Sequence, residues 1–98
     1  MTRLLAAVLA FAAASAAHGA DVIKGAQLYR QHCAGCHGQR GVSTMPAAPS
    51  FARGERLMQP DPALVASIRM GRASMPGFFG ILSDREILDV VAHLRSFR

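Results

Sequence analysis

The sequence predicts an all-α domain with about three main helices joined by turns and loops. Three segments repeat apolar residues at the spacing of a helix, and no segment between them alternates apolar and polar residues over the length of a strand. The chain has 98 residues, of which 51% are hydrophobic. This length is enough for one compact domain and too short for two.

The N-terminal segment has the pattern of a secretory signal peptide. A positively charged residue near the start is followed by an uncharged apolar run and then by small residues. The run is too short to span a bilayer. Small residues at the required positions allow cleavage after Ala17 or after Gly19. We therefore expect a signal peptide over residues 1–19, a mature domain over residues 20–98, export to the periplasm, and no stable membrane insertion after processing.

The first helix is expected from Asp21 to Ala34. The carboxylate of Asp21 can accept hydrogen bonds from the free amide groups of the first turn. Small and apolar residues recur on one face of this helix at intervals of three and four. These residues are Val22, Gly25, Ala26, Tyr29 and Cys33.

A second, short helix of about nine residues is expected to begin at Asp61. Asp61 is the predicted N-cap, and Pro62 suits the first helical position because its missing amide hydrogen would have no partner there. Gly71 is expected to end the helix. Its apolar stripe consists of Leu64, Val65 and Ile68.

The last helix has the strongest start signal in the chain. Ser83 and Glu86 form a capping box, in which each side chain accepts a hydrogen bond from the backbone of the other residue. His93 lies off the apolar stripe of this helix. The stripe consists of Ile87, Val90, Val91, Leu94 and Phe97.

The sequence Cys-Ala-Gly-Cys-His from Cys33 to His37 indicates covalent attachment of one haem. Thiols three residues apart at a helix end lie on one face and can add to two neighbouring vinyl groups of one porphyrin. The imidazole of His37 would then bind the iron. A processed chain of about 80 residues gains much from such a group, because its apolar core alone gives only marginal stability.

Three other interpretations of the motif are a zinc half-site, a thioredoxin-like redox pair and a chance cluster. Zinc would need two more ligands at comparable spacing, and the remaining histidines, His18, His32 and His93, are poorly placed for this role. A redox pair would be expected in a βαβ context, which this sequence lacks.

Met75 is the best candidate for the second iron ligand. It follows the second helix in a loop that contains glycine, and the fixed φ of Pro76 limits how far the backbone can move away. Met45, in the long segment 38–60, is the main alternative. Met58 could shield the haem edge, and Met70 is expected to pack at a helix end. We expect segments 38–60 and 73–82 to cover the two sides of the cofactor, with at most a helical turn over 51–57.

With these features the chain resembles the class I cytochromes c from Gly25 to Phe97. The resemblance implies that Gly25 and Tyr29 of the first helix cross the C-terminal helix closely, near Val90, Val91 and Leu94. It also implies that a proline carbonyl accepts the ring N–H of His37. Pro49 matches the family's Pro-x-Leu, with Phe51 in place of leucine, and Pro46 is the competing candidate. The last helix has His93 where the family has an aromatic residue.

An iron with both axial positions filled by His37 and Met75 favours one-electron transfer over catalysis. The resemblance therefore implies a monomeric periplasmic electron carrier with one covalent haem c, and not an enzyme. A dedicated donor or maturation subunit of a respiratory enzyme is the alternative, because the segment from Met75 to Phe97 is similar to small cytochromes encoded with bacterial denitrification systems. A gas-binding or peroxidase-like haem protein is a further alternative.

The net charge favours acidic redox partners. The formal charge is +5 at pH 7, and removal of the signal takes away one positive charge, Arg3. Such a balance can steer the protein toward an acidic docking surface. A single lysine and the absence of a basic run argue against nucleic acid. The expected docking surface has an apolar rim of Met45, Ala47, Ala48, Phe78 and Phe79 and a ring of Arg40, Arg53, Arg56, Arg69 and Arg72.

Overall fold

The computed structural model describes residues 19–97 of the chain. These residues form the expected all-α arrangement, which has four α-helices and two short 3₁₀ helices. The predicted signal peptide falls almost wholly outside the described residues. The helices are α1 (Val22–His32), α2 (Ala34–His37), α3 (Asp61–Met70) and α4 (Asp84–Leu94), and the 3₁₀ helices are η1 (Phe51–Arg53) and η2 (Arg95–Phe97).

The first predicted helix, Asp21 to Ala34, ends at His32 as α1, and a separate short helix, α2, follows it over the motif. Asp21 caps α1 as expected, and its carboxylate accepts hydrogen bonds of 3.0 Å from the backbone N–H groups of Ile23 and Lys24. The division occurs at Cys33, where φ is −121° and ψ is −35°. The Cys-x-x-Cys-His motif therefore forms a turn of its own with a new direction, rather than the end of a long helix.

Helix α3 is present, but Asp61 is not its N-cap. The backbone carbonyl of Pro60 accepts the first helical hydrogen bonds, from the N–H groups of Ala63 and Leu64. Asp61 is thus the first helical residue, and its carboxylate pairs with Arg95 at 2.8 Å. The side chain that the local pattern predicts as a helix cap therefore forms a tertiary ion pair instead.

Helix α4 agrees with the sequence at its start and on its apolar face. The backbone N–H of Glu86 donates to Oγ of Ser83 at 3.1 Å, and the N–H of Ser83 donates to Oε1 of Glu86 at 2.9 Å. The apolar stripe of α4 fills the core. Its four helical members, Ile87, Val90, Val91 and Leu94, are all at most 2% exposed.

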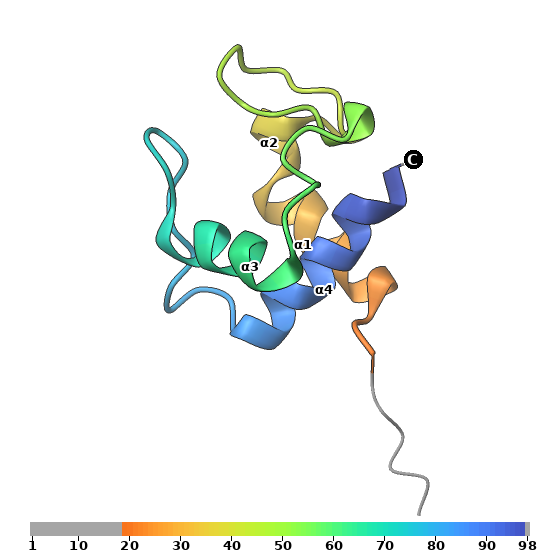
Figure 1. The fold of residues 1–98 in the computed structure, drawn as a ribbon, viewed down its shortest axis with the longest axis vertical. Helices are drawn as coiled ribbons and strands as arrows, with labels where there is room; N and C mark the ends of the chain where they lie inside the picture. Colours follow the sequence, from red (N-terminus) through yellow and green to blue (C-terminus); the bar gives the residue numbers. More distant parts are fainter. Residues whose placement is uncertain (1–18, 98) are drawn as a thin grey trace, which may run out of the picture.

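Helices α1 and α4 cross in close contact at the middle of the molecule (Figure 1). A Cβ atom added to Gly25 would lie 1.8 Å from the backbone oxygen of Asp89 and 3.0 Å from the backbone nitrogen of Val90. The expected crossing is therefore present, with its closest point at Asp89. The carboxylate of Asp89 is buried there and accepts the backbone N–H of Asp21 at 2.8 Å.

His93 lies off the buried stripe of α4, as expected, and it packs against aromatic rings. Its ring centroid is 5.0 Å from that of Tyr29 and 4.8 Å from that of Phe97. Burial lowers the pKa of His93, and the nearby charge of Arg30 adds to this shift. The imidazole thus takes the packing role of the aromatic residue that it replaces in the resemblance.

Replacing Gly25 with alanine should lower the free energy of unfolding by about 3 kcal/mol, because the methyl group would overlap the backbone of α4. Chemical denaturation of the haem-loaded protein measures this change. Gly35→Ala is the matched control, since a Cβ at Gly35 would meet no protein atom within 4 Å. Equal stability of the Gly25 variant and the wild type would contradict the described crossing.

The free energy of unfolding should fall as the pH drops below about 6.5, the usual pKa of histidine in an unfolded chain. The fold lowers the pKa of His93, so below that pH the unfolded state takes up a proton that the folded state resists. The contribution of His93 to the free energy of unfolding is complete above the pKa that it has in the unfolded chain. It is lost as the pH falls toward the lower pKa that it has in the folded protein. His93→Phe, which keeps a ring at this position, should have the shallower pH dependence. Parallel curves for variant and wild type would refute the prediction.

Candidate functional site

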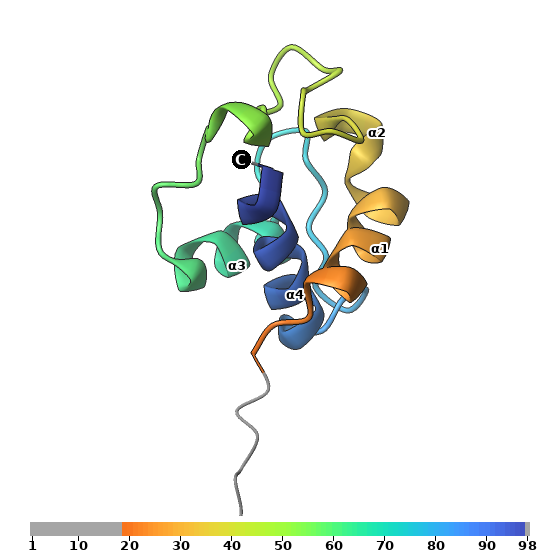
Figure 2. The ribbon, with the colours of Figure 1, turned by 90° about the vertical axis from the view of Figure 1, so that its right-hand side faces the viewer.

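The described residues enclose a largely apolar cavity of about 340 Å³ between the helices and the two long loops. In Figure 2 the chain after α2 loops over the top of the molecule and then descends to α3, and segment 71–82 approaches the same end as the loop. The cavity brings together Cys33, Cys36, His37 and Met75. The apolar and aromatic groups that line it include Ala47, Ala48, Phe51, Leu64, Ile68, Phe78, Val90 and Leu94.

His37 is buried, and its ring orientation is fixed from two sides. Its Nδ1 atom lies 3.0 Å from the carbonyl oxygen of Pro49, so of the two candidate prolines it is Pro49 that the ring reaches. The ring of Phe51 stacks on it with centroids 4.6 Å apart and planes inclined by 27°. A carbonyl can only accept, so Nδ1 carries the hydrogen and Nε2 has a free lone pair. That lone pair is suited to a metal ion.

The two cysteines lie at the wall of the cavity as free thiols, with Cys33 half-buried and Cys36 exposed. Burial raises the pKa of Cys33 to about 11, and the neighbouring Cys36 contributes to the shift. Reactive redox cysteines have the opposite property, a lowered pKa. This environment argues against the thioredoxin-like interpretation.

A zinc site also has no support in the described part of the chain. Structural zinc is held by four Cys, His or carboxylate ligands. Within residues 19–97 no three such groups are close enough together to hold a metal ion. His32, one of the histidines considered above, instead packs its ring against Phe78 at 5.6 Å.

The backbone that follows His37 is fixed by hydrogen bonds that the sequence did not reveal. The hydroxyl of Tyr29 donates to the carbonyl of Gly38 at 2.6 Å. Burial raises the pKa of Tyr29 to about 12, and Cys33 adds to the shift, so the phenol stays a donor. Thr44 donates through its backbone N–H to the carbonyl of Cys36 and through its hydroxyl to that of Gly35, both at 2.9 Å. These bonds hold segment 38–60 on the motif.

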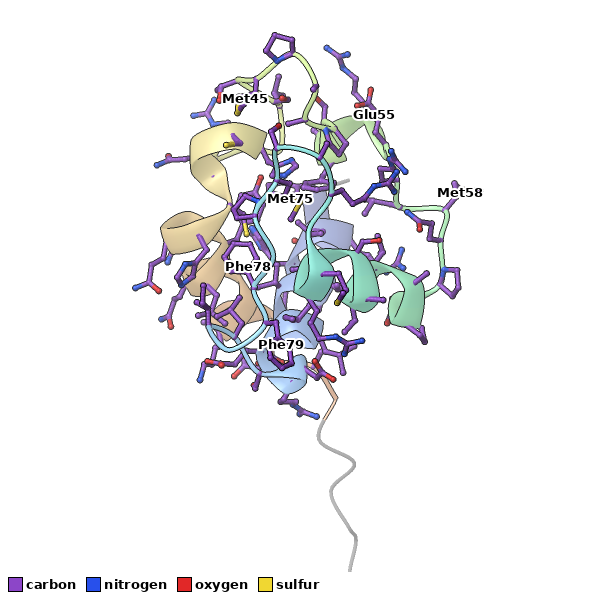
Figure 3. The ribbon with its side chains drawn as sticks, turned by 90° about the vertical axis from the view of Figure 1, so that its left-hand side faces the viewer. Met45, Glu55, Met58, Met75, Phe78 and Phe79 are labelled. Atoms are coloured by element: carbon purple, nitrogen blue, oxygen red, sulfur yellow. The ribbon has the colours of Figure 1, made fainter. Side chains whose placement is uncertain are left out.

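Met75 lines the same cavity from a tight loop after α3. The backbones of Arg72 and Met75 exchange two hydrogen bonds, of 3.1 and 2.8 Å. Two further bonds, from Phe78 to Ile68 and from Phe79 to Arg69, fasten the loop to α3. Met75 is half-buried and, like Phe78, lies near the centre of the molecule in Figure 3.

The other methionines are less well placed. Met45, in segment 38–60, also lines the cavity and is 41% exposed. Met58 was expected to shield the cavity, but it is 90% exposed and projects from the periphery (Figure 3). Met70 is 73% exposed at the end of α3, so the expectation that it packs is wrong.

The expected rim and arginine ring are only partly assembled. Arg56 and Arg72 line the cavity together with Met45, Ala47 and Ala48. Phe78 is buried and so forms part of the core rather than of a surface rim. Phe79 and Arg69 instead line a separate, more open depression next to the start of α4. Arg69 pairs there with Asp84, the first residue of α4, at 2.9 Å.

Comparisons with known proteins show similarity to cytochromes. A family model described as "Cytochrome C oxidase, cbb3-type, subunit III" matches residues 20–94. Cytochrome c6 of Thermosynechococcus vestitus is 32% identical over 83 residues, which cover 81% of this chain and 72% of the relative. Cytochrome c6 of a Nostoc species is 31% identical over 90 residues, which cover 90% of this chain and 81% of the relative.

Two solved structures are also similar. A c-type cytochrome, KustC0563, has a TM-score of 0.68 at 30% identity and covers 76% of this chain and 96% of its own. Cytochrome c6 from the diatom Phaeodactylum tricornutum has a TM-score of 0.66 at 27% identity, with coverage of 78% and 92%. Among the described residues, none of the helices is long and apolar enough to cross a bilayer.

Proposed function

Because the chain belongs to the small class I c-type cytochromes and is a haem c electron carrier, we propose that it shuttles single electrons in the periplasm through a haem ligated by His37 and Met75. The observation that supports this most is one apolar cavity lined by both cysteines and His37 of the motif and by Met75 of the loop after α3. The bound haem supplies the one-electron chemistry, in which iron alternates between two oxidation states.

The cavity residues fit a covalently bound haem. The chain contains two cysteines in all, Cys33 and Cys36, so two thioether bonds to one porphyrin must use both. Each bond forms when a thiol adds across a vinyl group, and no electrons are gained or lost overall. The aliphatic and aromatic lining suits the flat apolar faces of the ring.

His37 is proposed to bind the iron through Nε2. The Pro49 carbonyl fixes the tautomer and the ring direction, and it makes the imidazole a stronger donor because Nδ1–H is polarised toward oxygen. Phe51, stacked on the same ring, prevents rotation. These two contacts keep the ligand in place in both oxidation states, which lowers the reorganisation that accompanies electron transfer.

Met75 is proposed as the second ligand. A thioether is a soft ligand that favours the ferrous state and raises the reduction potential relative to a second nitrogen. The hydrogen bonds between the loop and α3 keep the sulfur in position. If His37 and Met75 both hold the iron, small molecules would have no open place at it, so a carrier is favoured over a gas-binding protein or a peroxidase.

The cavity mouth is the proposed contact surface for acidic redox partners. Arg56 and Arg72 place positive charge at this cavity, which the exposed side chain of Met45 also lines. The chain is also positive as a whole, with a formal charge of +5. Encounters between redox proteins are small and transient, so we expect steering by charge and a monomer in solution.

The periplasmic location rests on the predicted signal peptide, residues 1–19. A second candidate is a dedicated donor or maturation subunit of a respiratory enzyme. The description of the matching family model, which names a subunit of a cytochrome c oxidase, favours it. Both candidates need the same haem ligation and differ in how many partners accept the electron.

The test of the proposed ligation is the binding of CO to the reduced protein. Wild-type protein should resist CO, whereas Met75→Ala should bind it and should lose the weak sulfur-to-iron charge-transfer band of the ferric spectrum. Met45→Ala tests the competing ligand, and Met58→Ala is the control because Met58 is exposed. A pyridine haemochrome assay verifies that each variant still holds covalent haem. Loss of the band in Met45→Ala but not in Met75→Ala would reject Met75.

Electron exchange with an acidic redox protein should slow as ionic strength rises, because salt screens the attraction. At low salt, replacing both Arg56 and Arg72 with glutamine should reduce the second-order rate by about tenfold and flatten its salt dependence. Stopped-flow spectroscopy measures these rates. Arg30→Gln removes one charge from the last turn of α1 and is the control. An equal effect of the control would mean that overall charge, and not the cavity mouth, directs docking.

A further inference from the structure

We propose that Glu55 tunes the electron-donating strength of His37 through the peptide group between Pro49 and Ser50. Oε1 of Glu55 accepts the backbone N–H of Ser50 at 2.7 Å. The carbonyl oxygen of Pro49 lies 3.0 Å from Nδ1 of His37. These are the two ends of one peptide unit. The proposal rests on the proposed function, in which His37 binds the iron.

The two hydrogen bonds form a continuous chain of polarisation from a carboxylate to an imidazole. A peptide group is a resonance system in which charge withdrawn at N–H appears at the oxygen. A negatively charged acceptor on the N–H makes the carbonyl oxygen more negative, and hydrogen bonds linked in this way strengthen one another. The bond from Nδ1–H of His37 to Pro49 therefore becomes stronger when Glu55 is ionised.

The turn that contains this peptide is tightly constrained. Ser50 is buried, its Oγ accepts the backbone N–H of Ser43 at 2.9 Å, and its carbonyl accepts the N–H groups of Arg53 and Glu55 at 3.1 and 3.3 Å. Gly54 has φ of 78°, which bends the chain so that Glu55 returns to Ser50. The backbone turn at Gly54 and the side-chain hydrogen bond of Glu55 thus both direct the carboxylate at the peptide group.

Glu55 is a positioning residue in this scheme, because it acts through Pro49 and His37. A more polarised Nδ1–H gives the imidazole more of the character of its anion, which stabilises the higher iron charge. Removal of the carboxylate should therefore raise the reduction potential. A direct Coulomb effect has the same sign, but the Glu55 side chain is 46% exposed, so that effect should be screened by salt.

Glu55→Gln is the decisive variant, since glutamine can still accept the Ser50 N–H through its side-chain oxygen but carries no charge. We expect the equilibrium constant for electron exchange with a reference couple to change at least threefold toward reduction, which is about 28 mV at 59 mV per tenfold change. The change should persist at high salt. In the reduced protein, the NMR signal of the His37 Nδ1 proton should move as expected for a weaker hydrogen bond, and this proton should exchange faster with water.

Arg53→Gln is the matched control. Arg53 lies 4.0 Å from the Glu55 carboxylate and is 70% exposed, so this variant changes the charge at the same place without touching the hydrogen-bonded chain. It should leave the His37 Nδ1 proton unchanged, and any potential shift should disappear at high salt. Equal and opposite shifts in the two variants, both removed by salt, would overturn the proposal in favour of a simple charge effect.

A purely structural role for Glu55 would also overturn the proposal. In that case Glu55→Gln would lower the unfolding temperature but leave both the potential and the His37 proton signal unchanged. Glu55→Ala, which removes the hydrogen bond as well, should shift the potential further in the same direction. Failure of the proposed function is recognised separately. If the wild-type His37 ring signals lack the shifts expected of an iron ligand, the ligation itself is wrong, whatever Glu55 does.

Discussion

The close contact between α1 and α4 determines where the rest of the molecule can lie. At Gly25 the two backbones approach so closely that no side chain fits between them, and the carboxylate of Asp89 ties the start of α1 to α4. The direction of α1 fixes the position of the motif turn that follows it at Cys33. The crossing therefore sets the position of the motif at the cavity, and the two loops are built around that position.

The loops that build the cavity contain little regular structure, and a few directed hydrogen bonds hold them. Tyr29 connects α1 to the chain after His37, Thr44 satisfies carbonyls of the motif turn, and the segment around Met75 is bound to the end of α3. Nearly all of these bonds involve backbone groups. The loops can therefore keep a fixed shape although their sequence has little helical or strand periodicity.

The sequence predicted what depends on local patterns. The helical segments and the Ser83 capping box follow from spacing and residue type, and they are confirmed. The Asp61 cap was wrong, because Arg95, 34 positions later, pairs with its carboxylate. Phe78 was expected at a surface rim but is buried, because its surroundings come from other segments. The link from Glu55 to His37 passes through a folded loop, and residue spacing alone gives no sign of it.

The crossing of α1 and α4 also sets an order of events along the chain. It joins residues as far apart as Asp21 and Asp89, which are separated by 68 positions, and such a long-range contact cannot form until the last helix is available. Until then the thiols of Cys33 and Cys36 belong to a segment that lacks its packing partner, α4. The segment that carries both thiols therefore gains its full packing only through a contact that spans 68 positions of the chain.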